Sequence, residues 1–392
     1  MERKNLLVIH GGGPTVVLNS SLYGVVEEAK KKSDRIDHVY GARNGVEGLI
    51  KDDFIDLLAK SDEEIDALLT SPGTAIGSSR YPLDDEHYNK MVDHLISNNI
   101  GYVLMSGGNG TMATCGELSK FCDKRNTNIK VVGIPKTMDN DINVIDHSPG
   151  YLSAAKYIMQ TTREIVADVH SLPIHVCIIE VMGRNAGWVT ASSVMASNND
   201  GLAPDLIYVP EKPFDEEQFL KDVKKIYNKK GYAVVVVSEG LRGKDGKPIV
   251  PEIYRAGRSV YYGETSNFLA TEVIKHLGIK ARNEKPGLAG RCSIYLQSSV
   301  DRHEAVTVGR LSVQAALKGK TGVMVGIFRD HDETGDYRAS YHLVDIKEVM
   351  MTERKLPDKF INKENNYITD DFKKWIEPLL TKSDYFPIVN FN

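Results

Sequence analysis

The sequence predicts an α/β protein with at least two mostly parallel β-sheets, and three observations lead to this prediction. Short runs of apolar and β-branched residues recur along the chain. Each run ends in a glycine-rich or acidic turn, and helical spacing of apolar residues follows the turn. Strands that are apolar on both faces and alternate with helices are typical of parallel sheets covered on both sides.

The elements are predicted in order along the chain. The predicted strands lie at 5–10, 100–106, 129–137, 175–183 and 231–240. GKDGKP at 243–248 predicts an exposed turn, and the tail from Leu356 predicts a loop followed by a short helix capped by Thr369. Ligands of such sheets bind beyond the carboxyl ends of the strands, so the residues that follow each strand are the candidates for function.

Length and composition limit the class of protein. The chain has 392 residues, a length that suits two or three domains or two large interleaved ones. Hydrophobic residues make up 41% of it and charged residues 26%, which is ordinary for a globular protein. The net charge of −4 gives no general basic field for nucleic acid or an anionic membrane. A small anionic ligand needs only a local cluster of cations, so it remains compatible with this composition.

The cysteines and the apolar runs indicate the compartment. The four cysteines have no CxxC spacing and are predicted to be buried or partly buried thiols in a reducing compartment. The apolar run near the N-terminus is too short for a signal peptide, and no apolar stretch reaches the length of a membrane span. We therefore expect a cytoplasmic protein with no membrane partner.

Two glycine turns follow predicted strands. GGGPT at Gly11–Thr15 and SGGNGT at Ser106–Thr111 each open a helix. Glycine lets backbone approach an anion, and the free N–H groups of a helix start favour negative charge. Neither turn is a Walker A or GxGxxG motif, and each alone is compatible with a tight strand-to-helix turn. Together they favour a phosphate cradle, in which the Asn109 amide oxygen can orient a hydrated metal.

The segment IPKTMDNDI places two carboxylates beyond another buried strand. Phosphoryl transfer to an alcohol needs a base, a fixed cation and usually Mg²⁺. Asp139 or Asp141 can act as the base, Lys136 as the cation, and the remaining carboxylate as a metal ligand. The alternative is a solvated loop in which one aspartate caps a helix.

Four further residues with polar side chains lie near glycines in the sequence. Arg184 in EVMGRNAGW is suited to a phosphate or carboxylate, or alternatively pairs with an acid at a domain interface. Glu239, at the end of the strand 231–240, can accept a hydrogen bond from a sugar hydroxyl. Arg80 and Tyr81, in GTAIGSSRYP, either grip a nucleotide or form an ordinary surface turn.

Taken together, these motifs resemble the phosphofructokinase A family, and more closely its long-chain bacterial branch. The resemblance runs from the first strand to about residue 330. It rests on GGGPTVVLNSSL, GTAIGSSRYP, GGNGT, PKTMDND, PGYLSAAKYI, EVMGRNAGW and VSEGL, in this order. The succession of PKTxDxD and VMGRxAGW is highly specific for the family.

The resemblance implies two similar Rossmann-like three-layer α/β/α domains with mostly parallel sheets and an active site in the cleft between them. The larger, donor-binding domain would contain 1–145 and about 296–350, the smaller, sugar-phosphate-binding domain 146–295, and a C-terminal extension 351–392. The implied reaction moves a phosphoryl group from ATP or pyrophosphate to the 1-hydroxyl of fructose 6-phosphate, with Mg²⁺. A homodimer or homotetramer is implied as well.

The resemblance also implies roles for individual residues. Asp139 would be the general base, with Lys136 and Arg184 as the other catalytic residues. The residues expected to hold the donor are Gly12, Arg80, Tyr81, Gly108, Asn109, Gly110 and Thr111. Those expected to hold the substrate are Thr137, Asp141, Met182, Gly183, Arg184, Glu239 and Arg291. Those expected to hold the metal are Asn109, Asp139 and Asp141.

The choice of donor depends on two positions in this family. A carboxylate in place of Gly110 would crowd and repel the α-phosphate of a nucleotide, whereas glycine leaves room for it. On this argument ATP is the predicted donor. Lys136 and the GGN variant at Asn109 are typical of pyrophosphate users, so pyrophosphate is the alternative.

The acceptor is open to alternatives as well. Short-chain members bind the sugar phosphate through two arginines, and Ser298 and His175 stand at the corresponding places here. Arg291 can substitute for one of them; otherwise the acceptor is a different sugar phosphate or polyol. A catalytically silent homologue is a further alternative, although Asp139 and the glycine turns are present. A nicotinamide oxidoreductase would need a GxGxxG motif, which is missing.

Overall fold

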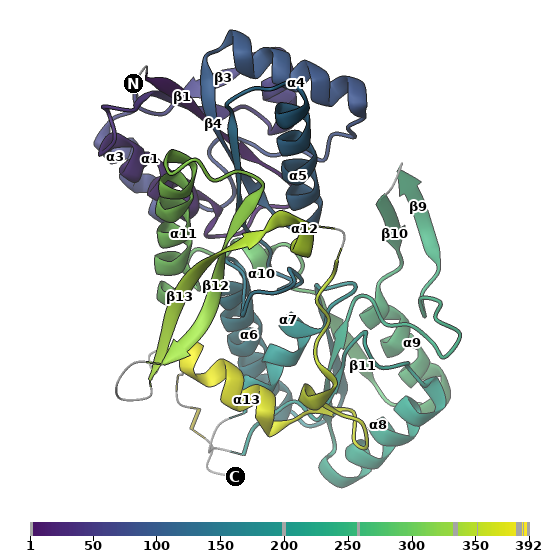
Figure 1. Ribbon diagram of the computed structural model, residues 1–392. Helices are drawn as coiled ribbons and strands as arrows, with labels where there is room; N and C mark the ends of the chain where they lie inside the picture. Colours follow the sequence, from purple (N-terminus) through teal and green to yellow (C-terminus); the bar gives the residue numbers. More distant parts are fainter. Residues whose placement is uncertain are drawn as a thin grey trace. The chain divides into compact units, whose positions relative to one another are not determined.

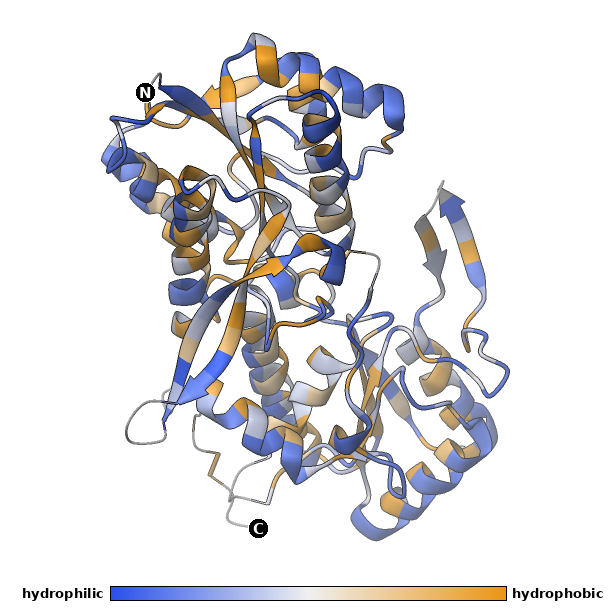
Figure 2. Ribbon diagram, viewed as in Figure 1, coloured by the Kyte–Doolittle hydropathy of each residue, from blue (hydrophilic) through white to orange (hydrophobic). Residues whose placement is uncertain are grey.

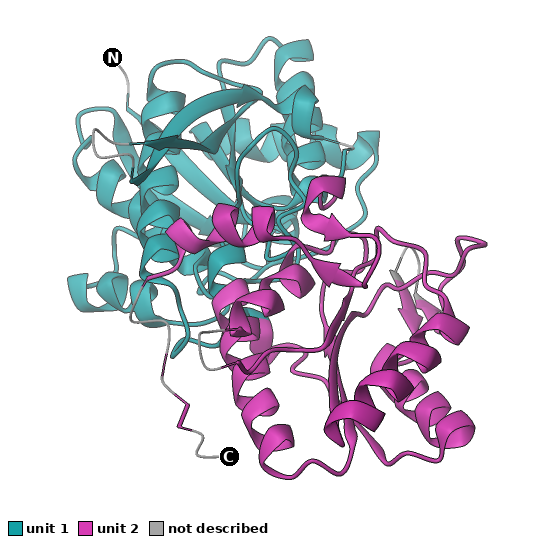
Figure 3. Cartoon of the chain, turned by 90° about the horizontal axis from the view of Figure 1, so that it is seen from below, with its two compact units in different colours: residues 1–153, 291–354 teal, residues 154–290, 355–392 magenta. Residues whose placement is uncertain are grey.

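The computed structural model describes residues 3–197, 201–256, 259–331, 336–350, 352–381, 386 and 388–389. The chain divides into two compact units (Figure 3). Unit 1 contains residues 1–153 and 291–354, and unit 2 contains 154–290 and 355–392. The expected boundaries at 145, 295 and 350 lie four to eight residues from those of the compact units at 153, 290 and 354, and the tail 355–392 groups with unit 2.

Unit 1 is built on a seven-stranded sheet (Figure 1). Its strands are β1 Lys4–His10, β2 Ile36–Ala42, β3 Phe54–Asp56, β4 Ile100–Gly107, β5 Lys130–Pro135, β12 Val323–His331 and β13 Tyr337–Asp345. The order is β13-β12-β5-β4-β1-β2-β3, and the five inner strands run parallel. Only the edge strands β3 and β13 pair antiparallel with their neighbours, among the described residues.

Helices cover both faces of this sheet. They are α1 Leu18–Lys30, α2 Val46–Lys51, α3 Asp62–Asp66, η1 Ala67–Thr70, α4 Asp85–Ser97, α5 Asn109–Lys124, α11 Ser299–Leu317 and α12 Ile346–Val349. Successive strand residues point to opposite faces: Leu7 and Val103 join one core, which includes α4 and α5. Leu6 and Leu104 join another, with α1 and α11. The apolar sheet interior is visible in Figure 2.

Unit 2 contains a four-stranded parallel sheet in the order β11-β6-β8-β7. Its strands are β6 Val176–Val181, β7 Leu206–Tyr208, β8 Ala233–Ser238 and β11 Ala281–Glu284. Two antiparallel hairpins accompany it: β9 Glu252–Ala256 with β10 Ser259–Tyr262, and β14 Ile361–Asn362 with β15 Tyr367–Ile368. The helices are α6 Tyr151–Ser171, α7 Trp188–Ala191, η2 Ser192–Ala196, α8 Glu216–Lys230, α9 Thr265–Leu277, α10 Ala289–Cys292, η3 Asp358–Phe360, α13 Asp370–Ile376 and η4 Glu377–Leu379.

Helices α1 and α11 pack with their backbones almost in contact. A Cβ placed on Gly24 would lie 2.1 Å from the carbonyl oxygen of Val306. A Cβ placed on Gly309 would lie equally close, 2.1 Å, to the carbonyl oxygen of Ser21. Both positions therefore require glycine for this packing, and α11 closes the core of unit 1 although it lies about 280 residues further along the chain than α1.

The structure confirms the α/β prediction and corrects one detail. Each of the five predicted strands is present, and 244–247 forms an exposed turn. Helix α13 begins after Thr369 as expected, but the Thr369 hydroxyl donates to the Lys359 carbonyl at 2.7 Å and does not cap the helix. The predicted free thiols are confirmed: three cysteines are buried and Cys292 is partly buried. Among the described helices none is both long and apolar enough to cross a bilayer.

Candidate active site

Three polar loops meet at the carboxyl edge of the unit 1 sheet. His10 at the end of β1 pairs with Ser106 of β4, and Gly107 of β4 pairs with Pro135 of β5. The segments that follow these strands, 11–15, 108–111 and 136–141, therefore start side by side. These are the segments that the sequence marked as candidates, and the register of the three parallel strands brings them together.

Lys136 lies at the centre of this edge. Its side chain is buried, with only 3% of the residue exposed. Its Nζ donates to the carbonyl oxygen of Gly11 at 3.1 Å and to that of Gly13 at 2.5 Å. Burial, together with the charges of Arg291 and Arg80, lowers the pKa of Lys136 to about 8 although Asp139 and Asp141 oppose this. A buried cation beside a glycine loop is suited to an anionic ligand.

Two arginines lie at the same glycine loop. A Cβ placed on Gly13 would be 2.6 Å from Nη1 of Arg291 and 3.8 Å from Nη2 of Arg80. The segment before Arg80 is bound to the loop, because the Ser78 hydroxyl donates to the Gly12 carbonyl at 2.7 Å. The Gly12 amide in turn donates to the carbonyl of the next residue, Ser79, at 3.0 Å. Three cationic side chains thus surround Gly11–Gly13.

The first turn of α5 forms the adjoining wall. Helix α5 begins after Gly108 and carries no acidic residue in its first turn, so its free N–H groups favour an anion. The Thr111 side chain packs against glycine on both sides: a Cβ on Gly11 or on Gly107 would lie 2.2 or 2.1 Å from its Oγ1. At Gly110, by contrast, an added Cβ would meet no atom within 4 Å.

The carboxylates of the 136–141 loop lie beside these groups. Thr137 Oγ1 accepts from the Asp139 amide at 3.1 Å. Asn109 Nδ2 donates to the Asp141 carboxylate at 3.0 Å and to its carbonyl oxygen at 3.1 Å. Burial raises the pKa of Asp141. Asn109 Oδ1 and Asp141 Oδ1 are buried and have no hydrogen-bond partner among the described residues. This pair of unused oxygens fits a hard cation such as Mg²⁺.

Unit 2 gathers the other predicted residues at the carboxyl edge of its own sheet. Val181 of β6 pairs with Ser238 of β8, so Met182–Arg184 and Glu239 follow neighbouring strands. The Gly183 amide donates to Glu239 Oε1 at 3.4 Å, and burial raises the pKa of Glu239 although Arg184 opposes this. Arg184 is exposed and donates to the Val260 carbonyl at 3.0 Å.

Three residues that the sequence singled out lie outside the two clusters at the carboxyl edges of the sheets. Tyr81 is 38% exposed, and its hydroxyl lies 3.3 Å from His87 Nε2. Ser298 is buried at the start of α11, where its hydroxyl accepts from the Asp301 amide at 3.4 Å. His175 precedes β6, at the amino end of the strand, whereas Met182 lies beyond its carboxyl end. Ser298 and His175 therefore have structural surroundings within their own units.

A buried ionic network, which sequence reasoning missed, lies further along the 136–147 segment. His147 is fully buried between two carboxylates: its Nδ1 is 2.8 Å from Asp146 and its Nε2 is 2.7 Å from Glu304. Burial opposes the charge on His147, but the carboxylates outweigh it and raise its pKa to about 9. Tyr337 donates to Glu304 at 2.6 Å, and Arg329 pairs with Asp146 at 3.1 Å. The sequence offered no signal, because Glu304 lies 157 residues from His147 and Arg329 lies 183 residues from Asp146.

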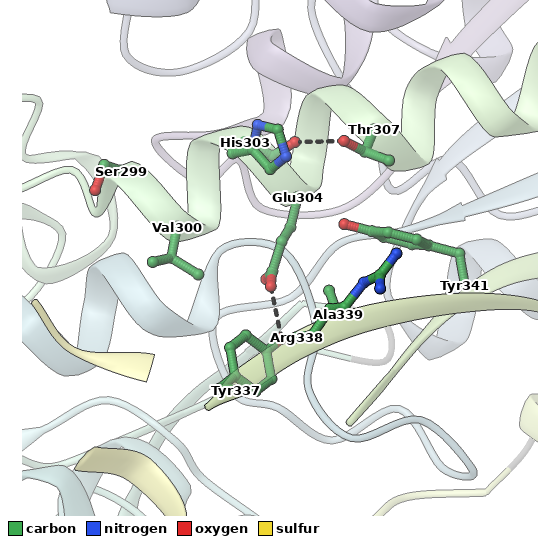
Figure 4. A pocket seen from close by; sticks show the side chains of 9 residues that line it. All are labelled: Ser299, Val300, His303, Glu304, Thr307, Tyr337, Arg338, Ala339 and Tyr341. Atoms are coloured by element: carbon green, nitrogen blue, oxygen red, sulfur yellow. Dashed lines mark hydrogen bonds between the residues drawn. The ribbon is translucent and has the colours of Figure 1, made fainter. Parts of the chain in front are cut away.

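A separate cavity of about 440 Å³ lies between α11 and β13 (Figure 4). Tyr337 and Tyr341 line it together with Glu304, His303 and Arg338. None of the predicted site residues borders it. The cavity is therefore distinct from the cationic loop at the carboxyl edge of the sheet.

The comparisons with known proteins agree with this geometry. The model of the phosphofructokinase family matches residues 5–316. The chain belongs to the phosphofructokinase family. This membership confirms the resemblance that the motifs indicated and, with the two α/β units, the fold expected for it.

Individual relatives are similar over nearly their whole length. Pyrophosphate--fructose 6-phosphate 1-phosphotransferase of Rhodospirillum rubrum is 34% identical over 97% of this chain and 95% of its own. Sulfofructose kinase of Alkalicoccus urumqiensis is 34% identical over 94% of this chain and 93% of its own. The solved pyrophosphate-dependent phosphofructokinase of Marinobacter aquaeolei superposes with a TM-score of 0.87 at 34% identity, over 99% of this chain and 94% of its own. The preference for ATP predicted from Gly110 is therefore not confirmed.

Proposed function

We propose that this family member transfers a phosphoryl group from pyrophosphate to the 1-hydroxyl of fructose 6-phosphate. One observation carries the proposal: Lys136, Arg80 and Arg291 surround the glycine loop beside the Asp139 segment. A compact, highly charged donor suits such a cluster. The R. rubrum relative and the M. aquaeolei structure are both named for pyrophosphate, which supports this donor over ATP.

In the proposed reaction the acceptor hydroxyl attacks the terminal phosphorus of pyrophosphate. Asp139 takes the hydroxyl proton as the new P–O bond forms, and the bond to the bridging oxygen breaks. The products are fructose 1,6-bisphosphate and inorganic phosphate. Lys136, fixed by the carbonyl groups of Gly11 and Gly13, stabilises the negative charge that gathers on the transferring and leaving groups.

A divalent cation has suitable ligands beside this cluster. We propose that Mg²⁺ is held by Asn109 Oδ1 and Asp141 Oδ1, the two buried oxygens without partners, with Asp139 nearby in the chain. When bound, Mg²⁺ would offset part of the donor's negative charge. The amide of Asn109 also orients the Asp141 carboxylate through its hydrogen bond of 3.0 Å.

We propose that residues of unit 2 bind the acceptor. Gly183, with φ of +121°, lets the backbone turn sharply after β6, and its amide reaches Glu239 at 3.4 Å. We propose that Met182, Gly183 and Arg184 contact the sugar phosphate and that Glu239 accepts from a sugar hydroxyl. A homodimer or homotetramer, as is usual for the family, is part of this proposal, and light scattering on the purified protein tests it.

A second candidate acceptor is sulfofructose. The sulfofructose kinase of A. urumqiensis is as similar to this chain as the R. rubrum enzyme, with 34% identity to each. In addition, Ser298 and His175 occupy the two sequence positions where short-chain relatives carry arginine, so this chain lacks both of those arginines. A singly charged sulfonate needs fewer cations than a phosphate.

Initial rates with four substrate pairs test the proposal. The purified protein is supplied with Mg²⁺, with pyrophosphate or ATP, and with fructose 6-phosphate or sulfofructose. We expect the highest kcat/KM with pyrophosphate and fructose 6-phosphate. A higher value with ATP contradicts the donor, and a higher value with sulfofructose contradicts the acceptor.

A further inference from the structure

Residues 182–188 of unit 2, the acceptor loop, are held at their beginning by residues at the end of β8. The Ser238 hydroxyl donates to the Gly183 carbonyl at 2.7 Å. A Cβ placed on Gly240 would collide with the carbonyl oxygen of Arg184, so the two backbone segments pack in direct contact. None of these contacts reaches the end of the acceptor loop.

A carboxylate from another part of unit 2 holds the end of the acceptor loop. Glu211, three residues beyond β7, accepts a hydrogen bond from the Gly187 amide at 2.8 Å through its Oε1. A Cβ placed on Gly187 would lie 2.6 Å from Oε2 of the same carboxylate, so this approach requires glycine. Oε2 is buried and has no hydrogen-bond partner among the described residues. The Glu211 carboxylate therefore packs directly on the backbone of the loop.

The same carboxylate oxygen binds the C-terminal segment, residues 355–379. The Leu356 amide donates to Glu211 Oε1 at 2.8 Å. Burial raises the pKa of Glu211, although the two amides that donate to it oppose this. The next residue, Lys212, donates to the Asn366 side chain at 2.7 Å. Residues that follow β7 thus join the acceptor loop to the C-terminal segment.

Aromatic packing joins the same two segments. Trp188, the residue after Gly187, is fully buried. The centroid of its ring lies 5.0 Å from that of Trp375 and 5.9 Å from that of Phe360. Phe372, also fully buried, packs against Phe360 with 5.5 Å between the ring centroids. Three aromatic rings of the C-terminal segment therefore cover the end of the acceptor loop.

We propose that Glu211 is a positioning residue for the acceptor, because it fixes the acceptor loop onto the C-terminal segment. The inference rests on the proposed function, in which residues 182–184 contact the sugar phosphate. If the loop had to become ordered on binding, that cost would be subtracted from the binding energy that Arg184 provides. Glu211 and the aromatic rings supply this order beforehand. The C-terminal segment lies beyond residue 316, where the match to the family model ends.

The variants Glu211→Ala and Glu211→Gln test this assignment in steady-state kinetics. We expect Glu211→Ala to raise KM for fructose 6-phosphate by about tenfold to a hundredfold, because the acceptor loop loses a hydrogen bond to a charged group. Its kcat and its KM for pyrophosphate should stay within about threefold, since the residues proposed to bind the donor belong to unit 1. Glu211→Gln keeps an oxygen that accepts from both amides, so it should recover part of the loss.

Asp205→Ala is the matched control. Asp205 precedes β7, at the opposite end of the strand from Glu211, and its carboxylate accepts from the Val234 amide at 2.8 Å. Its side chain is also buried, with 5% exposed. The loss of this carboxylate should lower the unfolding midpoint but leave KM for fructose 6-phosphate within about twofold. A merely structural role of Glu211 predicts the same pattern for Glu211→Ala.

Calorimetry and tryptophan fluorescence provide readouts that need no turnover. We expect Glu211→Ala to bind fructose 6-phosphate at least about tenfold more weakly than the wild type does. It should bind methylenediphosphonate, a pyrophosphate analogue that cannot be hydrolysed, equally well. Trp188 and Trp375 are the two tryptophans of the chain, so fluorescence reports on this contact directly. Acrylamide should quench Glu211→Ala more strongly than it quenches the wild type or Asp205→Ala.

Trp375→Ala tests the aromatic contact at a half-buried position. It should raise KM for fructose 6-phosphate by about threefold or more, because Trp188 loses a neighbouring ring. If Glu211→Ala does not fold, an unchanged KM in Trp375→Ala overturns the proposal.

Unchanged KM and affinity for fructose 6-phosphate in a folded Glu211→Ala overturn the proposal, as does equal quenching of Glu211→Ala and the wild type. If the wild type neither binds nor converts fructose 6-phosphate, the proposed function is contradicted instead. The quenching would then still decide whether Glu211 holds the acceptor loop.

Discussion

Lys136 illustrates how much of the proposed chemistry depends on one side chain and its surroundings. Burying a lysine until it is 3% exposed ordinarily destabilises a protein, because the ammonium group loses its hydration. Here two backbone carbonyl groups of the glycine loop accept hydrogen bonds from that ammonium group. Gly12, between these two carbonyl groups, has φ of +76°, a conformation that glycine adopts without strain. The sequence was enough to mark Lys136 as a candidate cation of the site. Its lowered pKa could not be predicted, because that pKa depends on burial and on the charge of Arg291, and both arise only in the folded chain.

This lowered pKa predicts how donor binding depends on pH. The free protein should lose the positive charge of Lys136 as pH rises through about 8, so affinity for methylenediphosphonate should fall above that pH. The variant Lys136→Arg stays charged over this pH range, so its affinity should not show the decrease that is caused by loss of the Lys136 charge. Any decrease that remains in the variant comes from titration of the ligand itself. Equal pH profiles for the two proteins, measured by calorimetry from pH 6.5 to 9.5, would refute the role given to Lys136.

At Asp139 the expected effect concerns turnover rather than binding. Asp139→Asn keeps the shape of the side chain but removes the base, so kcat should fall by about 10²- to 10⁴-fold. Affinity for methylenediphosphonate should change little, because the cationic loop is intact. Near-normal kcat in a protein with a normal unfolding midpoint would exclude Asp139 as the base.

At the scale of secondary-structure elements, the buried parallel strands could be predicted from the sequence, whereas the short and edge strands could not. Runs such as VVVV in β8 are apolar on both faces, so their composition alone indicates a buried parallel strand. The short strand β3, the edge strand β13 and the hairpin β9–β10 carry exposed or half-buried residues, and no comparable pattern marks them. The same holds for Thr369. The start of α13 could be predicted, but the Thr369 hydroxyl donates a hydrogen bond to the Lys359 carbonyl and so does not cap the helix.

The contact between α1 and α11 gives a prediction for stability. Gly24→Ala should lower the free energy of unfolding by about 1–3 kcal/mol, because the new methyl group would meet the Val306 backbone and the two helices would have to separate. Gly110→Ala is the control, since no atom lies within 4 Å of its Cβ position, and a helical alanine is favoured by about 0.5–1 kcal/mol. Urea unfolding measures both; equal stabilities of the two variants would show that the helices are not packed this closely.

The buried network around His147 predicts how stability depends on pH. An unfolded histidine has a pKa near 6.5, whereas the Glu304 and Asp146 carboxylates raise that of His147 to about 9 in the folded protein. The stabilisation is therefore fully present below about pH 6.5 and is lost as pH rises through about 9.

His147→Gln should remove this pH dependence. We expect it to lower the free energy of unfolding by about 3 kcal/mol at pH 6, because two buried carboxylates lose their cation, and by clearly less at pH 9.5. Urea unfolding at the two pH values provides the comparison. An equal loss at both would mean that His147 is neutral in the folded protein.

For the whole molecule, the order of motifs along the chain was sufficient to indicate the family, and the family model matches residues 5–316. The grouping of residues within unit 1 was also predictable, because Gly12, Asn109 and Lys136 all follow parallel strands. The preference for ATP predicted from Gly110 was not confirmed, because the R. rubrum relative is named for pyrophosphate. That prediction considered only what a side chain at Gly110 would exclude, and it left out the two arginines, Arg80 and Arg291, that the fold brings to Gly13.

Phosphoryl transfer at this site is tested most directly by a ³¹P NMR time course of the wild-type protein and Asp139→Asn with pyrophosphate, fructose 6-phosphate and Mg²⁺. We expect the wild type to convert pyrophosphate into one inorganic phosphate and one new phosphate ester per turnover. The variant, at equal concentration, should show almost no conversion. Phosphate release without a new ester, no consumption of pyrophosphate by the wild type, or equal rates in the two proteins would each contradict phosphoryl transfer at this site.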